Sequence, residues 1–425
     1  MMALDPKTFL TSIFEAAVAA ADPARTIRAH LPVKPKGRTI VIGAGKGSAQ
    51  MAAAFEKAWE GPIEGLVVTR YGYAAPCERI EIIEAAHPVP DEAGLRASKR
   101  LLEKVSGLTA DDLVVALISG GGSALLPSPA AGLTLADEIA VNEALLASGA
   151  PISAMNMIRK HVSTIKGGRL AAAAHPAKVV SLVVSDIPGD DPALVASGPT
   201  IPGEGSRADA LGLVNTYGMK LPDRVMAHLN SPDADAPEIG DPRFAGNEVH
   251  LISSAAFSLD AAAAEAKRQG IEAVILSDSI EGEAREVGSV HAALAREVAS
   301  RNRPFRKPVL ILSGGETTVT LRAGSSGGGK GGRNSEFLLA FAIGINGFDG
   351  IHALAADTDG IDGSEDNAGA FADGSSVARM RAAGVDAKAM LAGNNAWTAF
   401  NAVGDLFVPG PTGTNVNDLR AILIR

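Results

Sequence analysis

The sequence predicts an α/β protein whose parallel sheets are covered by helices on both faces. Apolar runs typical of strands alternate along the chain with runs of helical periodicity, and this order favours a parallel sheet. Hydrophobic residues make up 46% of the 425 residues and aromatic residues only 4%. The cores must therefore consist of Ala, Val, Leu and Ile, as in covered parallel sheets. Glycine-rich loops follow several predicted strands, at the edge where such sheets bind ligands.

The first half of the chain supplies a helix followed by five strands. Asp5-Pro6 predicts an N-cap with proline at the first helical position, and the apolar spacing from Phe9 onward gives this helix one buried face. The predicted strands are Thr39 to Ile42, Gly65 to Thr69, Ile80 to Glu84, Leu113 to Ser119 and Val179 to Ser185. The predicted helices among them are Ala49 to Trp59, Ala93 to Val105 and Leu135 to Ala147.

The second half begins after a proline-rich stretch. Residues 203–247 carry Pro222, Pro232, Pro237 and Pro242 among Asp and Gly, which is typical of a connecting region. We therefore expect a first domain over residues 1–240 and a second over residues 245–425. The strands predicted for the second domain are Val249 to Ser253, Glu272 to Leu276, Pro308 to Ser313, Thr317 to Arg322 and Ile351 to Ala356.

The charge balance and the cysteine count exclude several classes of protein. A net charge of -9 argues against nucleic acid as the main partner. The single Cys77 excludes an internal disulfide and a cysteine-built zinc site. Asp5, Lys7 and Glu15 interrupt any apolar core of a signal peptide, and no stretch approaches the ~20 apolar residues that span a bilayer. We expect a soluble, cytoplasmic protein without a membrane partner, and the sequence leaves its oligomeric state open, a homodimer included.

Glycine-rich loops with isolated cations indicate an anionic ligand. Glycine lets backbone N–H groups face an anion without an obstructing Cβ, and such loops at strand-to-helix turns bind phosphate or carboxylate. The four runs are Gly43-Ala44-Gly45-Lys46-Gly47-Ser48, Ser119-Gly120-Gly121-Gly122-Ser123, Ser313-Gly314-Gly315-Glu316, and Gly324 to Arg333 with Asn334 at a predicted helix N-terminus. Several such loops suggest a ligand with several anionic groups.

Known nucleotide-binding and hydrolase motifs are incomplete in these loops. In the first loop the third glycine comes one place too early for the dinucleotide fingerprint, although Arg70 at the end of the next strand would suit a 2′-phosphate. Lys46 and Lys330 lack the following Ser or Thr of a P-loop, and the G-x-S-x-G motif is absent at Ser119 and Ser313. We therefore predict an anion cradle distributed over several loops.

A basic stretch from Asn156 to Arg169 allows two interpretations. Its charged residues lie off the apolar helical stripe, and it ends at Gly167-Gly168. The stretch is either a solvated helix face or part of the anion site, and His161 is equally compatible with a structural role. Its charged residues are Arg159, Lys160, His161, Lys166 and Arg169.

Acidic residues follow one predicted strand in each domain. Carboxylates at the carboxyl ends of strands suit a Mg²⁺ ion that bridges phosphates, or a base for a substrate hydroxyl. We assign such a role to the group formed by Asp186, Asp190, Asp191, Asp357 and Asp359. Asp362 and Asp366 fit turn chemistry better.

Taken in order, these motifs cover nearly the whole chain and resemble the glycerate 2-kinase family with its C-terminal MOFRL domain. Further motifs that carry the resemblance are His87-Pro88-Val89-Pro90, Ser185-Asp186, Ala196-Ser197-Gly198-Pro199-Thr200, Gly331-Gly332-Arg333-Asn334, Asp357-Thr358-Asp359-Gly360 and Thr412-Gly413-Thr414-Asn415. The resemblance implies a Rossmann-like, three-layer N-terminal domain with a mostly parallel sheet, a smaller α/β MOFRL domain, and an active site in the cleft between them.

The resemblance also implies an activity. The family phosphorylates D-glycerate at its 2-hydroxyl with ATP and Mg²⁺ or another divalent metal, and it implies roles for Lys46 and Arg333. On this basis we expect Lys46, Arg333 and Asp186 to be catalytic, with Asp357 as the other candidate base, and Asp186, Asp191 and Glu316 to hold the metal. The residues expected to bind ATP are Gly43, Gly45, Ser119, Gly120, Gly121, Gly122, Ser123, Lys166, Gly314, Gly315, Gly331, Gly332, Asn334 and Asp357.

Two other classes of function stay open at this stage. A hydroxypyruvate reductase that uses NAD(P)H would depend on the imperfect motif at Gly43 and on Arg70, and members of the family have carried that name. A non-catalytic anion-binding module would bind without turnover. The paired acids and the glycine loops in both domains disfavour it.

Overall fold

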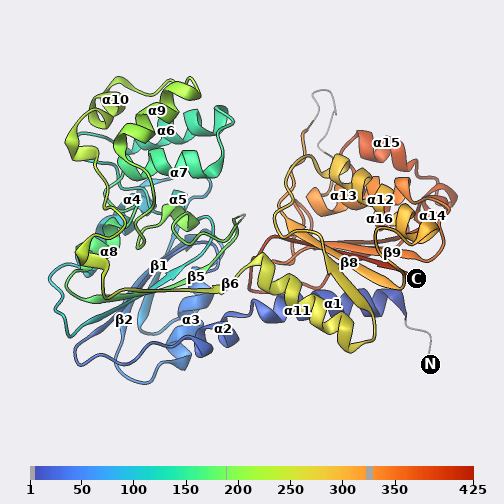
Figure 1. Ribbon diagram of the computed structural model, residues 1–425, viewed down its shortest axis with the longest axis horizontal. Helices are drawn as coiled ribbons and strands as arrows, with labels where there is room; N and C mark the ends of the chain where they lie inside the picture. The colour runs from blue at the N-terminus through green and yellow to red at the C-terminus, as the bar shows by residue number, and fades with distance from the viewer. Residues whose placement is uncertain (1–4, 188, 322–328) are drawn as a thin grey trace. The chain divides into compact units, whose positions relative to one another are not determined.

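The computed structural model describes residues 5–187, 189–321 and 329–425, which form two compact units (Figure 1). The first unit is Pro23–Ile252, and the second consists of the segment up to Asp22 together with Ser253–Arg425. This division differs from the predicted one at both ends of the first domain. The N-terminal helix packs in the second unit because its apolar face is buried there, and the strand predicted at Val249 joins the sheet of the first unit.

The first unit is built on a six-stranded sheet with the order β3-β2-β1-β4-β5-β6. The strands from β3 to β5 are all parallel to their neighbours, as predicted. Their bounds are β1 (Thr39–Ala44), β2 (Glu64–Arg70), β3 (Ile80–Ala85), β4 (Leu113–Ile118), β5 (Lys178–Val184) and β6 (Glu248–Ser253). The strand order reverses between β1 and β4, which is the point where open α/β sheets bind ligands.

Helices cover both faces of this sheet. Alternate residues Ile40, Ile42 and Ala44 of β1 pack in one core with α4 and α8, whereas α3 packs on β1 and β2 outside that core. In Figure 1, α4 and α8 lie above the sheet and α3 lies below it. The helices are α2 (Pro23–Ala29), α3 (Ser48–Ala58), α4 (Glu92–Lys104), α5 (Gly122–Leu125), α6 (Leu135–Ala147), α7 (Ile152–His161), α8 (Arg169–Ala174), α9 (Arg207–Thr216) and α10 (Asp223–Leu229).

The stretch expected to be only a connection contains helices. Within residues 203–247, α9 begins at a capping box in which Ser206 and Asp209 bond reciprocally, and α10 follows Pro222. Together with α6 and α7 these helices enclose their own apolar cluster, which includes Val141, Ile158 and Val214. The prolines lie at helix starts and in the turns between helices. The proline-rich composition therefore did not predict the two helices α9 and α10.

The second unit contains a mixed six-stranded sheet of order β11-β10-β9-β12-β8-β7. Only β7 and β8 pair in parallel, and the other recorded pairs are antiparallel. The strands are β7 (Glu272–Ile275), β8 (Val309–Gly315), β9 (Ile351–Asp357), β10 (Gly369–Asp373), β11 (Leu406–Phe407) and β12 (Asp418–Ile424). The strand predicted at Thr317 to Arg322 is wrong for the described part: β8 is already paired on both sides, and Thr318 forms only an isolated bridge with Glu283. Arg322 lies outside the described residues.

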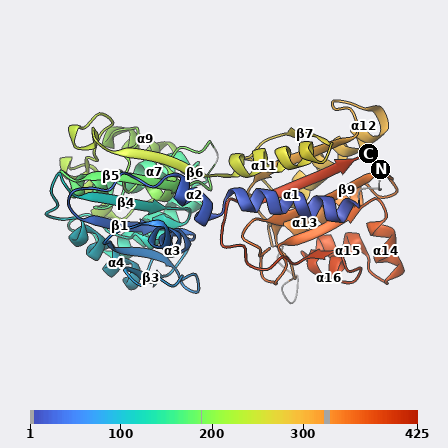
Figure 2. The same cartoon turned by 90° about the horizontal axis from the view of Figure 1, so that it is seen from below.

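Two helical layers enclose this second sheet. Leu310 and Leu312 of β8 face α1 and α11, whereas Val309 and Ile311 face α12 and α13. Figure 2 shows α1 and α11 side by side along one face of the sheet. The helices are α1 (Pro6–Ala20), α11 (Ala255–Arg268), α12 (Ala284–Arg301), α13 (Arg333–Gly344), α14 (Ser376–Ala382), α15 (Ala387–Ala392) and α16 (Ala396–Asn401).

The predicted start of α1 is confirmed. Asp5 accepts a hydrogen bond from the backbone N–H of Thr8, with Pro6 at the first helical position, and Phe14 meets Phe407 edge to face at 5.0 Å. None of the helices in the described ranges is long and apolar enough to cross a membrane.

We predict that Phe14→Ala destabilises the second unit. The ring is 2% exposed, and truncating such a buried aromatic side chain typically costs about 3–5 kcal/mol. Urea unfolding of the full chain would measure this loss. The control is Leu146→Ala, on the exposed side of α6, which should cost no more than about 0.5 kcal/mol. Similar losses for the two variants would contradict the assignment of α1 to that core.

Candidate active site

Two loops meet where the order of the first sheet reverses. One follows β1 and carries Lys46, and the other follows β4 and carries Gly120. The parallel register aligns Ala44 with Ile118, so both loops leave the sheet at the same level. The N–H of Lys46 donates to the carbonyl of Gly120 at 2.9 Å, and the N–H of Ser119 donates to the carbonyl of Ala44 at 3.1 Å.

The backbone donors of the first loop are already used within the protein. Gly45 donates to Val68, Gly47 donates to the Ser119 hydroxyl at 3.0 Å, and Ser48 donates back to Gly45. A Cβ on Gly45 would lie 2.1 Å from Ser119 Oγ, and one on Gly43 would lie 2.4 Å from the Leu117 carbonyl oxygen. Gly43, in β1, therefore permits close packing against β4, and Gly45 permits close packing against Ser119. The role expected for them in nucleotide binding stays a prediction. The first loop offers a ligand the Lys46 side chain.

The second loop keeps its donors available. Gly121 adopts a left-handed conformation with φ of 78° just before α5, and the first N–H groups of a helix have no partner within the helix. In the described part of the chain, no protein acceptor bonds the N–H groups of Gly120, Gly121, Gly122 or Ser123. This row of donors is the part of the predicted cradle that suits an anion in the structure.

Asp186 lies directly against this second loop. A Cβ on Gly120 would lie 1.7 Å from Asp186 Oδ2, so the absence of a side chain at Gly120 makes room for the carboxylate. Asp186 comes two residues after β5, which pairs with β4. The sheet thus brings the predicted base beside the available N–H groups.

A buried relay of polar side chains supports Ser123. Its hydroxyl lies 2.6 Å from the Ser197 hydroxyl, and Ser197 donates to Asn156 Oδ1 at 2.9 Å. Arg159 donates to the same Asn156 oxygen at 3.1 Å. Ala196 and Ser197 hold left-handed backbone conformations, with φ of 54° and 61°, which are strained for residues other than glycine. Part of the basic stretch thus supports the loop from behind.

The other basic residues of that stretch have structural partners. Lys160 donates to the carbonyls of Gly203, Glu204 and Gly205 at 2.6–2.9 Å, and the His161 ring bonds the Ala234 carbonyl at 2.8 Å. Lys166, expected to bind the nucleotide, is buried in an ion pair with Glu138. It is thus engaged within the protein in this structure rather than presented to a ligand.

The predicted metal ligands are divided between the two units. Asp186 and Asp191 belong to the first unit and Glu316 to the second. Asp191 accepts a hydrogen bond from the N–H of Ala193 in its own turn. Among the described residues, no three His, Cys, Asp or Glu side chains lie close enough to hold a metal ion. A Mg²⁺ that arrives with nucleotide phosphates requires only one or two carboxylates, so Asp186 alone could serve such an ion.

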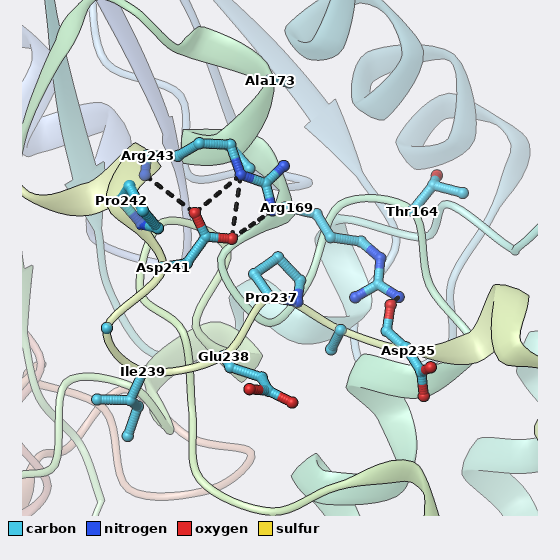
Figure 3. A pocket seen from close by; sticks show the side chains of 13 residues that line it. Thr164, Arg169, Ala173, Asp235, Pro237, Glu238, Ile239, Asp241, Pro242 and Arg243 are labelled. Atoms are coloured by element: carbon cyan, nitrogen blue, oxygen red, sulfur yellow. Dashed lines mark hydrogen bonds and ion pairs between the residues drawn. The ribbon is translucent and has the colours of Figure 1, made fainter.

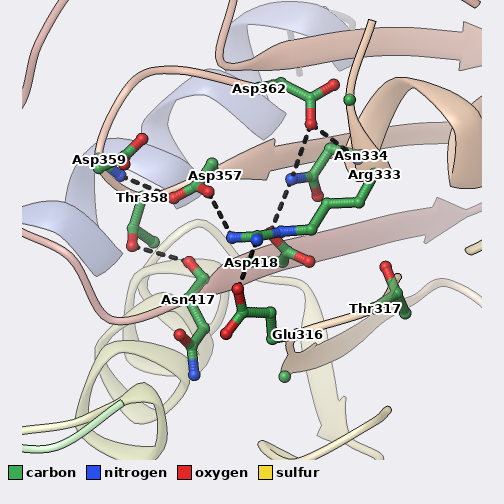
Figure 4. A network of polar contacts seen from close by, with 12 residues as sticks. Glu316, Thr317, Arg333, Asn334, Asp357, Thr358, Asp359, Asp362, Asn417 and Asp418 are labelled. Carbon is green, nitrogen blue, oxygen red and sulfur yellow. Dashed lines mark hydrogen bonds and ion pairs between the residues drawn. The ribbon is translucent and has the colours of Figure 1, made fainter. Parts of the chain in front are cut away.

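The second unit holds a different centre around Arg333, the first residue of α13 (Figure 4). Its guanidinium donates to Asp418 at 2.8 Å, to Glu316 at 2.5 Å and to Asp357 at 2.6 Å. The antiparallel register places Asp418 opposite both Asp357 and Gly315, and this brings the carboxylates together. Arg333 is therefore already surrounded by three carboxylates, of which only Glu316 is half-exposed.

No sequence motif pointed to Asp418 and Arg420 as members of this centre. Both lie on the central strand β12, and Arg420 donates to Asp418 Oδ2 at 2.8 Å and to the carbonyl of Gly314 at 3.0 Å. The only signal was an Asp-Leu-Arg start to an apolar run near the end of the chain. Burial, with the charges of Asp418 and Asp359, raises the pKa of Asp357 well above its ordinary value, which suits an acidic centre only partly balanced by Arg333.

The glycines near Arg333 do not present a cradle in the described part of the chain. Asp362 accepts from the N–H groups of Asn334 and Ser335 at 2.9 and 2.8 Å, and Gly332 donates to the Ser335 hydroxyl. The expected role for the backbone of Gly331, Gly332 and Asn334 in nucleotide binding is thus not supported. Asp362 instead caps α13, a structural role, although it is a contact with a distant helix and not the local turn that was predicted. The run from Gly324 to Gly328 lies outside the described residues.

Gly314 and Gly315 form the end of strand β8 rather than a loop. Gly314 donates to the Ser277 carbonyl, and both carbonyls accept from Arg420. A Cβ on Gly315 would lie 2.2 Å from the Ile280 nitrogen. These two glycines permit close packing, so their predicted contact with the nucleotide is not supported.

A hollow of about 830 Å³ in the first unit is a poor match for an anion (Figure 3). It is lined by Thr164, by residues of α8 and by residues 235–243. Arg243 is bonded to both oxygens of Asp241, and Arg169 donates to backbone carbonyls. Neither Lys46 nor the second loop lines it. Cys77 is a poor nucleophile, because burial raises the pKa of its thiol to about 11 and disfavours the reactive thiolate.

Comparison with known proteins supports one family for the whole chain. A family model described as a domain of unknown function, DUF4147, matches residues 9–230, and the MOFRL family model matches residues 309–418. A protein of Agrobacterium vitis with the provisional name hydroxypyruvate reductase is 52% identical over 98% of this chain and 94% of its own length. The D-glycerate 2-kinase of Thermotoga maritima is 39% identical over 98% of both chains.

A solved structure agrees with this comparison. The crystal structure of glycerate kinase from Thermotoga maritima superposes with a TM-score of 0.89 at 38% identity, covering 99% of each chain. The fold is that of a two-unit α/β protein with a six-stranded sheet in each unit. The chain belongs to the DUF4147–MOFRL family, which includes the glycerate 2-kinases.

We predict that Lys166 stabilises the fold and does not bind the nucleotide. Lys166→Met alone leaves Glu138 charged and buried, which typically costs about 3–5 kcal/mol. The double variant Lys166→Met/Glu138→Gln removes both charges and keeps an oxygen for the N–H of Ser128, which bonds Glu138. It should recover most of the loss in urea unfolding. If the double variant is stable but its KM for ATP rises more than about tenfold, Lys166 is a nucleotide ligand instead.

We predict that His87 is neutral at pH 7, first because the ring is buried and second because Lys46 and Arg70 lie nearby. Burial, together with the charges of Lys46 and Arg70, lowers the pKa of His87 to about 4. Lys46→Met removes one opposing positive charge and should raise this pKa towards 6.5, as measured by NMR titration of the ring. Lys57→Met, at an exposed site on α3, is the matched control. An unchanged His87 pKa in Lys46→Met would show that the two side chains do not interact.

Proposed function

We propose that this protein is a glycerate 2-kinase, which transfers the γ-phosphoryl group of ATP to the 2-hydroxyl of D-glycerate and yields 2-phospho-D-glycerate and ADP. Relatives named as glycerate 2-kinases match over nearly its full length. The observation that carries the proposal is the row of available N–H groups from Gly120 to Ser123 beside Lys46. Phosphoryl transfer requires positioning and charge stabilisation more than covalent chemistry, and this loop provides both.

The second loop acts on the transferring phosphoryl group. Its N–H groups are held in place by the Lys46–Gly120 hydrogen bond and by the relay behind Ser123. Donors that are fixed before the reaction stabilise developing negative charge without reorganising. Lys46 adds a full positive charge next to Gly121, because a Cβ there would lie 3.2 Å from Lys46 Cε, the carbon that carries the ammonium group.

Asp186 is the proposed base. As the 2-hydroxyl oxygen forms its bond to the γ-phosphorus, the bond between that phosphorus and the bridging oxygen of ADP breaks, and the hydroxyl proton passes to the Asp186 carboxylate. Its contact with Gly120 places the carboxylate beside the N–H groups that would bind the phosphoryl oxygens. A general base must lie within hydrogen-bond reach of the proton that it accepts.

A divalent metal ion such as Mg²⁺ would neutralise phosphate oxygens when bound with ATP. Asp186 is the carboxylate of the first unit best placed to contact it. Asp191 and Glu316, the other two predicted ligands, are engaged by Ala193 and Arg333. We therefore propose Asp186 as the protein's ligand for this ion.

Arg333 is the residue of the second unit that we propose to bind a substrate anion, and this requires one change in its contacts. Three carboxylates already balance its charge, so a substrate anion must replace one of them. The half-exposed Glu316 is the most accessible of the three. Asp357 is buried and bonded to Arg333, which makes it a weaker candidate base than Asp186.

A reductase with a nicotinamide cofactor is the second candidate, because a relative with 52% identity carries that provisional name. Dinucleotide binding at a strand-to-helix turn depends on backbone N–H groups that face the pyrophosphate. After β1 those groups already bond Val68, Gly120, Ser119 and Gly45. This occupancy counts against the reductase.

We predict ATP-dependent formation of 2-phosphoglycerate from D-glycerate, measured by coupled assay and by NMR identification of the product. Lys46→Ala should lower kcat/KM more than tenfold, because it removes the charge beside the loop. Arg333→Ala should do the same if Glu316 releases it to substrate.

The control reaction is NADH or NADPH oxidation with hydroxypyruvate. Turnover in that assay without phosphoryl transfer would establish the reductase instead. If Lys46→Ala and Arg333→Ala both retain kcat/KM within about tenfold of the original value, the assignment of these residues fails even where the kinase activity stands.

A further inference from the structure

Three nitrogen-bearing side chains lie at the carboxyl ends of three adjacent strands of the first sheet. Lys46 follows β1 by two residues, Arg70 is the last residue of β2, and His87 follows β3 by two residues. The register aligns Ala44 with Val68 and Arg70 with Ala85, so all three positions lie at or just beyond the same edge of the sheet. Neither Arg70 nor His87 has a role in the mechanism above.

Contacts around Gly121 bring two of these side chains together. A Cβ on Gly121 would lie 3.1 Å from His87 Nε2 and 3.1 Å from Lys46 Cγ. The two side chains therefore flank Gly121, the left-handed glycine of the second loop. Burial, together with the charges of Lys46 and Arg70, lowers the pKa of the His87 ring to about 4, so Arg70 lies close enough to disfavour protonation of His87.

The two cations are not neutralised within the protein. Over the described ranges, neither Lys46 nor Arg70 forms an ion pair with a carboxylate. Arg70 instead stacks on the ring of Tyr73 at 3.7 Å, which fixes its plane and leaves its N–H donors available. Arg333 differs because three carboxylates surround it. In an acidic protein, two neighbouring unpaired cations at a ligand-binding edge indicate an anion site.

We propose that Lys46, Arg70 and His87 form the subsite for the carboxylate of the small hydroxy acid, with Arg70 as the residue that determines the requirement for that carboxylate. The identity of the acid rests on the proposed function, whereas the carboxylate chemistry rests on these three groups. A planar guanidinium binds a carboxylate through two parallel hydrogen bonds. Neutral His87 provides one ring N–H donor and adds no further charge.

The position of this subsite fits the reaction. In a 2-hydroxy acid the reacting hydroxyl is attached to the carbon next to the carboxylate. A carboxylate held by Arg70 and His87 therefore leaves the hydroxyl close to Gly121, whose neighbours supply the N–H groups proposed for the phosphoryl oxygens. Binding energy from the non-reacting carboxylate would then orient the hydroxyl.

The test compares Arg70→Gln and His87→Gln with the unmodified protein in steady-state kinetics. For Arg70→Gln we expect the KM for D-glycerate to rise roughly 10- to 100-fold, because a charge-assisted pair is lost, and the KM for ATP to stay within about twofold. His87→Gln keeps a donor and should show a smaller rise. Arg28→Gln, at an exposed site on α2 of the same unit, has the same charge change and should alter neither constant.

A second arm measures binding without turnover. Isothermal titration of D-glycerate, in the absence of ATP, should show binding to the unmodified protein that Arg70→Gln loses and Arg70→Lys retains in part. Glycerol, which lacks the carboxylate, should not compete with D-glycerate for the unmodified protein or for Arg70→Lys. Because Arg70 stacks on Tyr73, urea unfolding of each variant establishes that the fold is retained, and Arg70→Lys supplies the comparison if Arg70→Gln does not fold.

The outcomes separate this inference from the proposed function. A rise in the KM for ATP with an unchanged KM for D-glycerate would assign Arg70 to the phosphates and overturn the subsite. Unchanged constants in a folded Arg70→Gln would also overturn it. If no phosphoryl transfer occurs but D-glycerate binding depends on Arg70, the subsite stands and the kinase assignment fails.

Discussion

The candidate site depends on the joining of two loops where the order of the first sheet reverses. Lys46 donates to Gly120, Ser119 donates to Ala44, and Gly47 donates to the Ser119 hydroxyl. These bonds use the donors of the first loop and thereby fix the second. Only a residue without a Cβ fits against Leu117 of β4 at Gly43 and against Ser119 at Gly45. One glycine-rich loop thus serves as the support, and the other is left to face the ligand.

The cations of the two candidate sites differ in whether protein carboxylates surround them. In the first unit, Lys46 and Arg70 have no carboxylate partner among the described side chains, so the sheet edge keeps an attraction for anions that an overall charge of -9 would otherwise oppose. In the second unit, Arg333 lies among three carboxylates and Arg420 is fully buried beside them. That arrangement stabilises the local structure, and an anion reaches Arg333 only by competing with protein carboxylates.

The sequence predicted the sheets better than it predicted which groups bind a ligand. The strand-like runs before Gly43 and Ser119 became β1 and β4 because a buried parallel strand leaves a clear apolar signature. The partners of the loop N–H groups depend on contacts between segments about seventy residues apart, such as Gly47 with Ser119, which no local pattern records. The burial of Lys166 against Glu138 and the position of Asp418 opposite Asp357 also arise only from tertiary packing.

The place of α1 has a consequence for the order in which the chain gains structure during synthesis. Helix α1 packs against α11 and β12, although it leaves the ribosome before both of them. The first unit, in contrast, is one continuous segment and can fold once it has emerged, as domains generally do. The apolar face of α1, which includes Phe9 and Phe14, therefore has no partner until α11 begins, about 235 residues further along the chain, and its contact with β12 forms only when that last strand has been made.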